Sequence, residues 1–251
     1  MNFHRYNVLE STNLHLINMA KKNAPAWTIV LADAQTGGMG RSGRSWWSPP
    51  GGLYMSVLVR PTVQPFALSR MPVLASLAAL DVLKGAGLPA RVKWPNDILI
   101  RGKKLAGILI QGRTDGENVH WVVVGYGVNI HRSNTGTPHE IGERIIFLED
   151  THIQVTRDWL AETIAARLRD RIVSLGEDTW ERAMKEWTQS AFWNAPYIHR
   201  DGRGEIRGTP LRLARDGGLV LGTDGGEVTV YSGEIMETVQ SPGFKVQSRQ
   251  P

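Results

Sequence analysis

The segment that decides between the possible folds is "GGMGRSGRSWWSPPGG", residues 37–52. Residues 38–43 fit the G-x-G-x-x-G pattern of dinucleotide-binding folds, and residues 38–45 fit the phosphate-binding P-loop except that Arg44 replaces its lysine. Both motifs require a helix directly afterwards, but the chain continues as WWSPP. We therefore expect a loop between two strands, whose glycines expose backbone N–H groups and whose arginines attract an anion. The alternative is an ordinary mobile basic loop, in which two exposed tryptophans would be unusual.

The composition narrows the classes of protein to which the chain can belong. Its 251 residues are 41% hydrophobic, which suffices for one large domain or for a medium and a small one. It has no cysteine, which excludes disulfides, thiolate metal sites, Fe–S clusters and a cysteine nucleophile. The first residues show no signal-peptide pattern, and no apolar run approaches the ~20 residues that cross a bilayer. We therefore expect a cytoplasmic enzyme without membrane association.

The charge distribution indicates an anionic partner. The formal net charge of +5 fits a nucleotide, a nucleic acid or an acidic protein as partner, or simply a scattered basic surface. No acidic residue occurs between Asp33 and Asp81, whereas Arg41, Arg44 and Arg60 do. The positive charge is therefore concentrated around the glycine-rich loop.

Periodicity predicts an α+β protein with two domains. The predicted strands cover residues 3–10, 27–34, 53–61, 91–94, 97–100, 104–112 and 120–130, and the predicted helices cover residues 11–23, 66–87, 156–175 and 177–189. The third helix is amphipathic, with Trp159, Ile164, Leu168, Ile172 and Leu175 on its apolar face. From about residue 197, short alternating segments separated by Asp-Gly-Gly turns predict a small antiparallel β unit. We expect a mixed β-sheet domain flanked by helices over residues 1–192, an SH3-like β-barrel over residues 193–240 and a disordered tail over residues 241–251.

Two further segments have both a structural and a functional interpretation. "KWPND", residues 93–97, is typical of a turn whose Asn and Asp side chains bond the backbone, and alternatively of a site for a polar ligand or a metal–phosphate cluster. In "GKKLAGIL", residues 102–109, strict alternation places one lysine on the face of Ala106 and the other on the face of Gly107. An inward-facing lysine requires an anion, whereas two solvated turn lysines are the alternative.

Glycines in the last predicted strand of the first domain carry a similar ambiguity. Gly125 and Gly127 interrupt a valine-rich strand that ends at Asn129, which indicates either close approach of a ligand or a β-bulge. No H-E-x-x-H zinc motif and no G-x-S-x-G elbow occurs, so metalloprotease and serine hydrolase chemistry lack support.

Taken in order, these segments resemble the biotin protein ligases (biotin–[acetyl-CoA-carboxylase] ligases) over nearly the whole chain. The motifs that carry the resemblance are STN (11–13), QTGGMGRSGRSWWSP (35–49), RVKWPNDILI (91–100), KLAGIL (104–109), GYGVNI (125–130) and GGEVTVYSGEI (225–235). The resemblance implies a biotin/lipoate ligase-like catalytic domain that uses biotin, ATP and Mg²⁺ to form biotinyl-5′-AMP and pyrophosphate. The acyl group then passes to a lysine of a biotin carboxyl carrier protein. A homodimer formed through an edge strand is compatible with this fold.

The resemblance also assigns roles to residues at matching positions. For biotin it implies Ser11, Thr12, Asn13, Gln35, Met39, Gly40, Arg41, Lys104 and Gly107; for ATP it implies Arg41, Trp47, Asn96, Asp97 and Asn129. Lys104, Arg41 and Arg44 are the implied catalytic residues, and Asp97 is the implied metal ligand. One position departs from the pattern, since Met39 stands where the family usually has the first loop arginine.

General chemistry agrees with these roles. Adenylation brings a carboxylate to an α-phosphate, so cationic side chains are needed to offset the repulsion. The product is a mixed anhydride that water would destroy, and a flap with a hydrophobic shoulder at Trp46 and Trp47 would exclude water.

Two other functions remain open on the sequence. A lipoate or octanoate ligase or transferase would use the same fold with another acyl chain. A nucleic-acid-binding module would explain the positive charge and would bind less tightly as salt increases. Since the STN motif begins at residue 11, we expect no helix-turn-helix domain and no sequence-specific DNA binding.

Overall fold

The computed structural model describes residues 1–60, 65–115, 118–193, 197–201, 204–231 and 234–237. The chain divides into two compact units, one of Met1–Phe192 with Arg215–Gly217 and one of Trp193–Ala214 with Gly218–Pro251. Three sequence predictions fall outside the described residues: the end of the third strand at Pro61, residues 232–233 of the last motif, and the disordered tail at residues 241–251.

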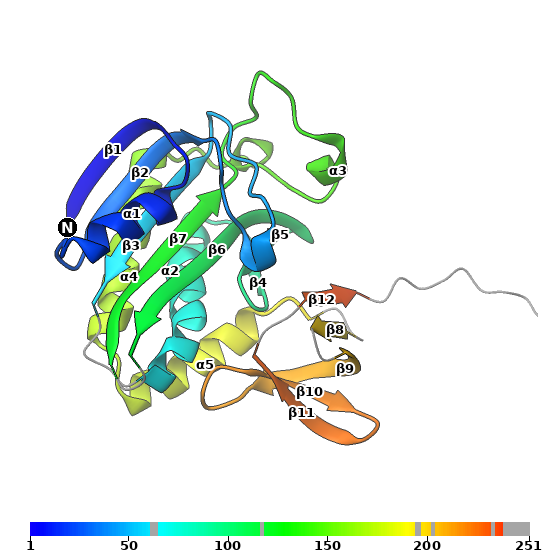
Figure 1. The fold of residues 1–251 in the computed structure, drawn as a ribbon. Coiled ribbons are helices and arrows are strands. Elements are labelled where there is room, and N and C mark those ends of the chain that lie inside the picture. The colour runs from blue at the N-terminus through cyan, green and yellow to red at the C-terminus, as the bar shows by residue number, and fades with distance from the viewer. Residues whose placement is uncertain (61–64, 116–117, 194–196, 202–203, 232–233, 238–251) are drawn as a thin grey trace, which may run out of the picture. The chain divides into compact units, whose positions relative to one another are not determined.

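The first unit contains a seven-stranded mixed sheet with the strand order β1-β2-β3-β7-β6-β5-β4 (Figure 1). The strands are β1 (Asn2–Leu9), β2 (Thr28–Gln35), β3 (Leu53–Val59), β4 (Arg91–Lys93), β5 (Asp97–Ile100), β6 (Lys103–Thr114) and β7 (Val119–Val128). β1 and β2 are parallel, and every other neighbouring pair is antiparallel. The predicted strands are therefore confirmed.

Helices cover both faces of this sheet (Figure 1). The longer helices are α1 (Thr12–Lys21), α2 (Met71–Gly85), α4 (Arg157–Val173) and α5 (Glu177–Ser190), and α3 is the short helix His139–Gly142. Helix α1 packs against β2, β3 and β7, while α2 packs against β6, α4 and α5. Because α2 lies between the sheet and two other helices, it is apolar on nearly all sides. No helix in the described part of the chain is long and apolar enough to span a membrane.

Helix α1 begins where the sequence predicts. Ser11 is the N-cap residue, with extended backbone angles, and its side-chain oxygen accepts a hydrogen bond from the Leu14 backbone N–H. The helix buries Leu16 and Ala20 against Val30 and Leu58 of the sheet. Complete burial of a side chain such as Leu16 contributes about 1.5–3 kcal/mol. The apolar face thus holds the polar start of α1 against the sheet.

Helix α4 corrects one expectation about its apolar face. Trp159, which the sequence pattern places on that face, is 43% exposed, and Leu160 is buried in its place. The buried residues are Leu160, Ala161, Ile164, Ala165 and Leu168. Ile164 and Leu168 are buried as predicted, so only Trp159 was placed on the wrong face, because small alanines give a weaker periodic signal than a large tryptophan.

The second unit is an antiparallel sheet. Its strands are β8 (Tyr197–Asp201), β9 (Gly204–Leu213), β10 (Leu219–Thr223), β11 (Gly226–Val230) and β12 (Glu234–Glu237). Their order is β11-β10-β9-β8-β12, with a register irregularity between Val220 and Leu221. The first and last strands of this order, β11 and β12, are not paired with one another within the described residues. The antiparallel β unit is therefore confirmed, and the described strands form an open sheet.

Candidate active site

The glycine-rich segment forms a folded-back loop between β2 and β3, as the sequence predicts. Met39 and Ser45 form an isolated antiparallel bridge, and the Trp46 N–H donates to the Gly38 carbonyl oxygen at 2.9 Å. At the tip, Ser42 and Gly43 have left-handed φ angles of 56° and 73°. The helical segment in this loop is a single 3-10 turn, so neither a dinucleotide-binding helix nor a P-loop helix follows the glycines.

The loop returns to the sheet through a chain of hydrogen bonds. Gln35 Nε2 donates to Ser48 Oγ at 2.9 Å, and Ser48 Oγ donates to the Trp46 carbonyl oxygen at 2.9 Å. Tyr54 Oη donates to the Pro49 carbonyl oxygen at 2.7 Å. Burial raises the pKa of Tyr54, so its hydroxyl remains protonated and keeps donating this bond. The end of β2 and the start of β3 therefore fix the position of the loop.

A buried polar network lies at the N-terminus of α1. The Thr12 backbone N–H donates to Gln35 Oε1 at 2.8 Å, and Thr12 Oγ1 donates to the same oxygen at 3.1 Å. Ser56 Oγ lies 2.8 Å from Thr12 Oγ1 and 2.6 Å from Asn13 Oδ1. Asn13 Nδ2 donates to Gln111 Oε1 at 2.9 Å. Three of the predicted biotin-binding residues thus belong to one connected set.

The second cluster is centred on the predicted catalytic lysine. Lys104 Nζ lies 2.8 Å from Asp97 Oδ1 and 5.0 Å from the ring centroid of Trp46. Asp97 Oδ1 is out of contact with solvent and has no aligned hydrogen-bond donor in the described structure, so this ammonium is its charged partner. The indole Nε1 of Trp46 is also out of solvent contact and has no hydrogen-bond partner among the described residues. A buried polar atom without a hydrogen bond lowers the stability of the fold, and it can form that bond with an atom of a ligand.

Arg41 reaches the same place from the loop. Its Nη1 lies 3.4 Å from Asn96 Oδ1, and Asn96 Nδ2 donates to the Ile108 carbonyl oxygen at 2.8 Å. Asn129 Nδ2 donates to the Lys104 carbonyl oxygen at 3.2 Å, which ties the end of β7 to the start of β6. Arg41 and Lys104 therefore contact the adjacent residues Asn96 and Asp97, and Asn129 contacts the backbone of Lys104, so the four predicted ATP-binding polar residues all lie in this cluster.

The other predicted loop residues occupy less enclosed positions. Arg44 is exposed, and Trp47, Met39 and Gly40 are half-buried. The Gly40 N–H donates to the Arg44 carbonyl oxygen at 2.7 Å, which closes the loop tip. Trp46 was not among the predicted binding residues, although it is the tryptophan that lies over Lys104.

A β-bulge corrects the predicted alternation of the two lysines. Leu99 pairs with Lys104 and Ile98 pairs with Ala106, so Leu105 is an extra residue on β6. Lys104 consequently shares a face with Gly107, where a methyl group added in place of the glycine hydrogen would lie 3.3 Å from Lys104 Cε. Strict alternation would have placed Lys104 with Ala106 instead. Lys103, by contrast, is exposed.

The structure contradicts the β-bulge interpretation of the two glycines of β7 and shows close approach of side chains there. A Cβ on Gly127 would lie 2.5 Å from Nε1 and Cε2 of Trp46, and a Cβ on Gly125 would collide with the Asn13 side chain. The register irregularity between β6 and β7 lies at Arg113 and not at these glycines. The glycines therefore make room for side chains of the loop and of α1, and no bulge is present there.

Sequence reasoning missed Ser56 and Ser48 as members of the site. Ser56 is fully buried in β3, and Ser48 is 5% exposed. A serine within a strand that is otherwise apolar was a usable signal, since a buried hydroxyl requires a partner.

This geometry suits the activation of an anionic substrate. Arg41 and Lys104 supply two cations beside Asn96 and Asp97, and Gly107 and Gly127 leave room there for the Trp46 indole. Within the described residues, no group of three or more His, Cys, Asp or Glu side chains is placed to hold a metal by itself.

Comparisons with known proteins agree with this arrangement. The Biotin/lipoate A/B protein ligase family matches residues 6–129. The bifunctional ligase/repressor BirA of Bacillus subtilis is 32% identical over 92% of this chain and 72% of its own length. A biotin–[acetyl-CoA-carboxylase] ligase of Mycobacterium tuberculosis is 32% identical over 90% of this chain and 85% of its own length.

A solved structure shows the same architecture. The biotin protein ligase from Aquifex aeolicus in complex with biotin and ATP superimposes with a TM-score of 0.78 and 26% identity, covering 94% of this chain and 97% of that one. Since the sequence relatives extend over both units and the fold agrees, the chain belongs to the Biotin/lipoate A/B protein ligase family and groups with its biotin protein ligases.

Proposed function

We propose that this protein is a biotin protein ligase that activates biotin with ATP and transfers it to a lysine of a biotin carboxyl carrier domain. The observation that carries the proposal is the convergence of Arg41 and Lys104 on Asn96 and Asp97, beside the buried network at the start of α1. A cationic cluster together with a neutral hydrogen-bonding network fits a ligand with a polar neutral head and a reactive carboxylate. Biotin, with its ureido head and valerate chain, has this form.

The head of biotin would bind the network at the start of α1. Ser11, Thr12 and Gln35 offer a hydroxyl, a backbone N–H and an amide there, and Ser56 bonds both Thr12 and Asn13. Direct hydrogen bonds already join Thr12, Gln35, Ser56 and Asn13 to one another. A ureido group with matching donors and acceptors can therefore replace part of the network without leaving an atom unsatisfied.

Adenylation would then take place beside Lys104. A carboxylate oxygen of biotin attacks the α-phosphorus of ATP, a bond forms between them, and the bond to the bridging oxygen breaks so that pyrophosphate leaves. Lys104 and Arg41 reduce the repulsion between the two anions and stabilise the charge that develops on the phosphate oxygens. Trp46 covers Lys104 and limits access of water to the mixed anhydride.

Transfer requires no further protein nucleophile. The amine of the carrier lysine attacks the acyl carbon, the acyl–phosphate bond breaks, AMP leaves, and the amine loses a proton. The Nε1–H of Trp46 has no hydrogen-bond partner among the described residues, so it can donate a hydrogen bond to an oxygen of the bound adenylate.

Asp97 fits the role of a Mg²⁺ ligand. Mg²⁺ usually binds one or two protein carboxylates together with substrate phosphates and water. Asp97 Oδ1 is buried with only Lys104 as a charged partner in the described structure, and the adjacent Asn96 carries a side-chain oxygen that Arg41 contacts. When bound, Mg²⁺ would neutralise phosphate charge as Lys104 turns from Asp97 toward the substrate.

The proposal extends to the finer features of the molecule. We assign the C-terminal unit, whose described strands form an open antiparallel sheet, to the SH3-like class, and the enzyme to the cytoplasm without binding DNA. A homodimer through β1 (Asn2–Leu9) is compatible with the position of that strand at the edge of the sheet.

Mass spectrometry tests the central proposal. Incubation with biotin, ATP and an isolated carrier domain is expected to add one biotinyl group to one carrier lysine. Calorimetry with biotin, lipoate and octanoate in turn separates the acyl-chain alternatives, which Met39 leaves open. Heat with lipoate and none with biotin would replace the proposal, and salt-sensitive nucleic-acid binding without ligase activity would favour the binding-module alternative.

A further inference from the structure

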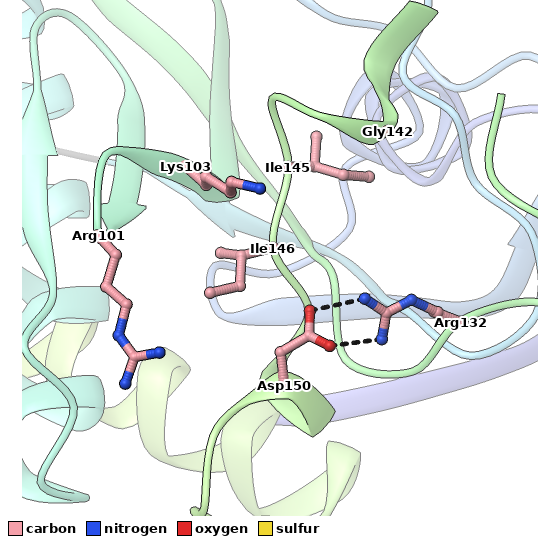
Figure 2. Close-up of a pocket in the computed structure, with 7 residues that line it drawn as sticks. All are labelled: Arg101, Lys103, Arg132, Gly142, Ile145, Ile146 and Asp150. Carbon is pink, nitrogen blue, oxygen red and sulfur yellow. Dashed lines mark hydrogen bonds and ion pairs between the residues drawn. The ribbon is translucent and has the colours of Figure 1, made fainter. Parts of the chain in front are cut away.

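A second group of cationic side chains lies near the start of β6. A cavity of about 320 Å³ is lined by Arg101, Lys103, Arg132, Gly142, Ile145, Ile146 and Asp150. Figure 2 shows Arg101 and Lys103 on one side of it and the Arg132–Asp150 pair on the other. All these residues belong to the first unit.

The cationic side chains on the two sides of the cavity differ in their contacts with carboxylates. Arg132 is held in place, because Nη1 and Nη2 lie 2.5 Å and 2.9 Å from the Asp150 oxygens, Nη1 lies 3.0 Å from Glu149 Oε1, and the guanidinium stacks 4.8 Å from the Phe147 ring centroid. Arg101 and Lys103 are exposed and form no direct ion pair in the described structure, although the Asp150 carboxylate is close enough to interact electrostatically with Lys103. The cavity therefore presents two exposed cations, one of which Asp150 partly offsets.

Backbone hydrogen bonds connect the wall of the cavity to the proposed reaction site. The Lys104 N–H donates to the Arg144 carbonyl oxygen at 2.8 Å, and the Ile146 N–H donates to the Lys104 carbonyl oxygen at 3.0 Å. The wall of the cavity thus pairs directly with the catalytic lysine. Lys103, the residue before it, is exposed toward the cavity.

The lining indicates the kind of partner. Ile145 and Ile146 give the cavity an apolar wall, and the cations lie around it. A compact phosphate site would instead present converging backbone N–H groups. A carboxylate on an aliphatic stem matches an apolar wall with cations at its rim, and such a group is an acidic side chain on a protein surface.

We infer that this cavity docks an acidic side chain of the carrier protein during the transfer step. The inference rests on the proposed function, since the protein that delivers its lysine to the site beside Lys104 must cover the neighbouring rim. Charges at the edge of an interface act mainly on encounter and alignment, so Arg101 and Lys103 set the affinity for the carrier and leave adenylate formation unaffected.

The two half-reactions provide the test. The Arg101→Glu/Lys103→Glu variant is compared with Arg167→Glu/Lys185→Glu, which changes the net charge equally at exposed positions of α4 and α5. Pyrophosphate release with biotin and ATP alone measures adenylation, and labelling of an isolated carrier domain measures transfer. We expect the first variant to release pyrophosphate within about twofold of the parent rate while its KM for the carrier rises about 10- to 100-fold, as for paired interface charges. The second variant should match the parent in both.

Each other outcome is decisive. An unchanged KM for the carrier would overturn the docking site and leave the ligase function intact, because both half-reactions would still proceed. A parallel loss of pyrophosphate release would show that the cavity serves ATP or the fold, and would equally overturn the inference. Absence of adenylate in the parent protein would instead refute the proposed function. Transfer to free lysine, which carries no docking surface, should be the same in the first variant and the parent.

Discussion

Replacing Lys104 by methionine tests whether its ammonium serves chemistry or only the fold. The substitution keeps most of the aliphatic stem and removes the positive charge. In the structure that charge lies 2.8 Å from Asp97 Oδ1 and 5.0 Å from the ring centroid of Trp46. Lys104→Met therefore leaves a buried carboxylate oxygen without a cation and removes one contact from the tryptophan that covers the site.

The loss of folding stability and the loss of adenylation rate can be estimated separately. Leaving a buried polar group unsatisfied costs about 1–3 kcal/mol. The Lys104 and Asp97 side chains are 31% and 26% exposed, so solvent screening places the loss of unfolding free energy toward the lower part of that range, about 1–2 kcal/mol. Loss of a group that stabilises transition-state charge lowers a rate by about 10²–10³-fold. Adenylation should thus be impaired far more than folding.

A second substitution separates the two causes. Asp97→Asn in the Lys104→Met background removes the stranded charge, so urea denaturation should show most of the lost stability restored. Pyrophosphate release should stay low in the double variant because the ammonium is still absent. Parental pyrophosphate release by Lys104→Met would show that Lys104 is not catalytic. A double variant no more stable than Lys104→Met would show that the ion pair is not the source of the destabilisation.

Other contacts in the structure predict the effects of further changes. Gly127→Ala places a Cβ 2.5 Å from the Trp46 indole, so the indole must move. The loop that carries Trp46 should then exchange its amide hydrogens faster, and adenylation should slow. Unchanged hydrogen exchange in the loop would contradict this packing. In parent protein, biotin and ATP together should slow exchange in that loop, and equal exchange with and without them would count against a closing flap. Ser56→Ala removes a buried hydroxyl from the network at the start of α1 and should cost about 1 kcal/mol of stability and weaken biotin binding in calorimetry, with ATP binding unchanged as the control. Burial alone would raise the pKa of Asp150, but hydrogen bonds from Arg132 and a backbone N–H hold the pKa below its ordinary value of 3.8. The ionised Asp150 therefore stabilises the fold fully above pH 3.8, and this contribution is lost as the pH falls below that value. Arg132→Ala should accordingly lower stability by about 1 kcal/mol or less at neutral pH and by a smaller amount near pH ~3, and an equal loss at both would refute the assignment.

The sequence predicted those elements whose signals are local. The helix predicted from residue 11 is confirmed with Ser11 as its cap, and the strands predicted over residues 97–100 and 104–112 are confirmed as β5 and β6, joined by a two-residue turn. Arg101 and Gly102 both adopt left-handed angles there, with φ of 51° and 75°. Which of two adjacent tryptophans would lie over Lys104 was not readable, because that choice depends on how the loop folds back on itself through contacts between distant residues. The burial of Ser56 likewise depends on α1 crossing the sheet above it.

The identity of the proposed catalytic lysine depends on one extra residue in β6. Alternation has a period of two, so a shift of one residue exchanges the faces of all following side chains. In β6 the extra residue is Leu105, and it places Lys104 on the same face as Gly107 while Lys103 lines the cavity on the other side. Without the bulge, Lys104 and Gly107 would lie on opposite faces, and the ammonium could not share the space bordered by Trp46. The bulge thus gives two consecutive lysines separate environments, one beside Asp97 where we propose that charge assists adenylation and one at the rim where we infer that the carrier docks. This division also explains why the two half-reactions should respond to substitutions at neighbouring positions independently.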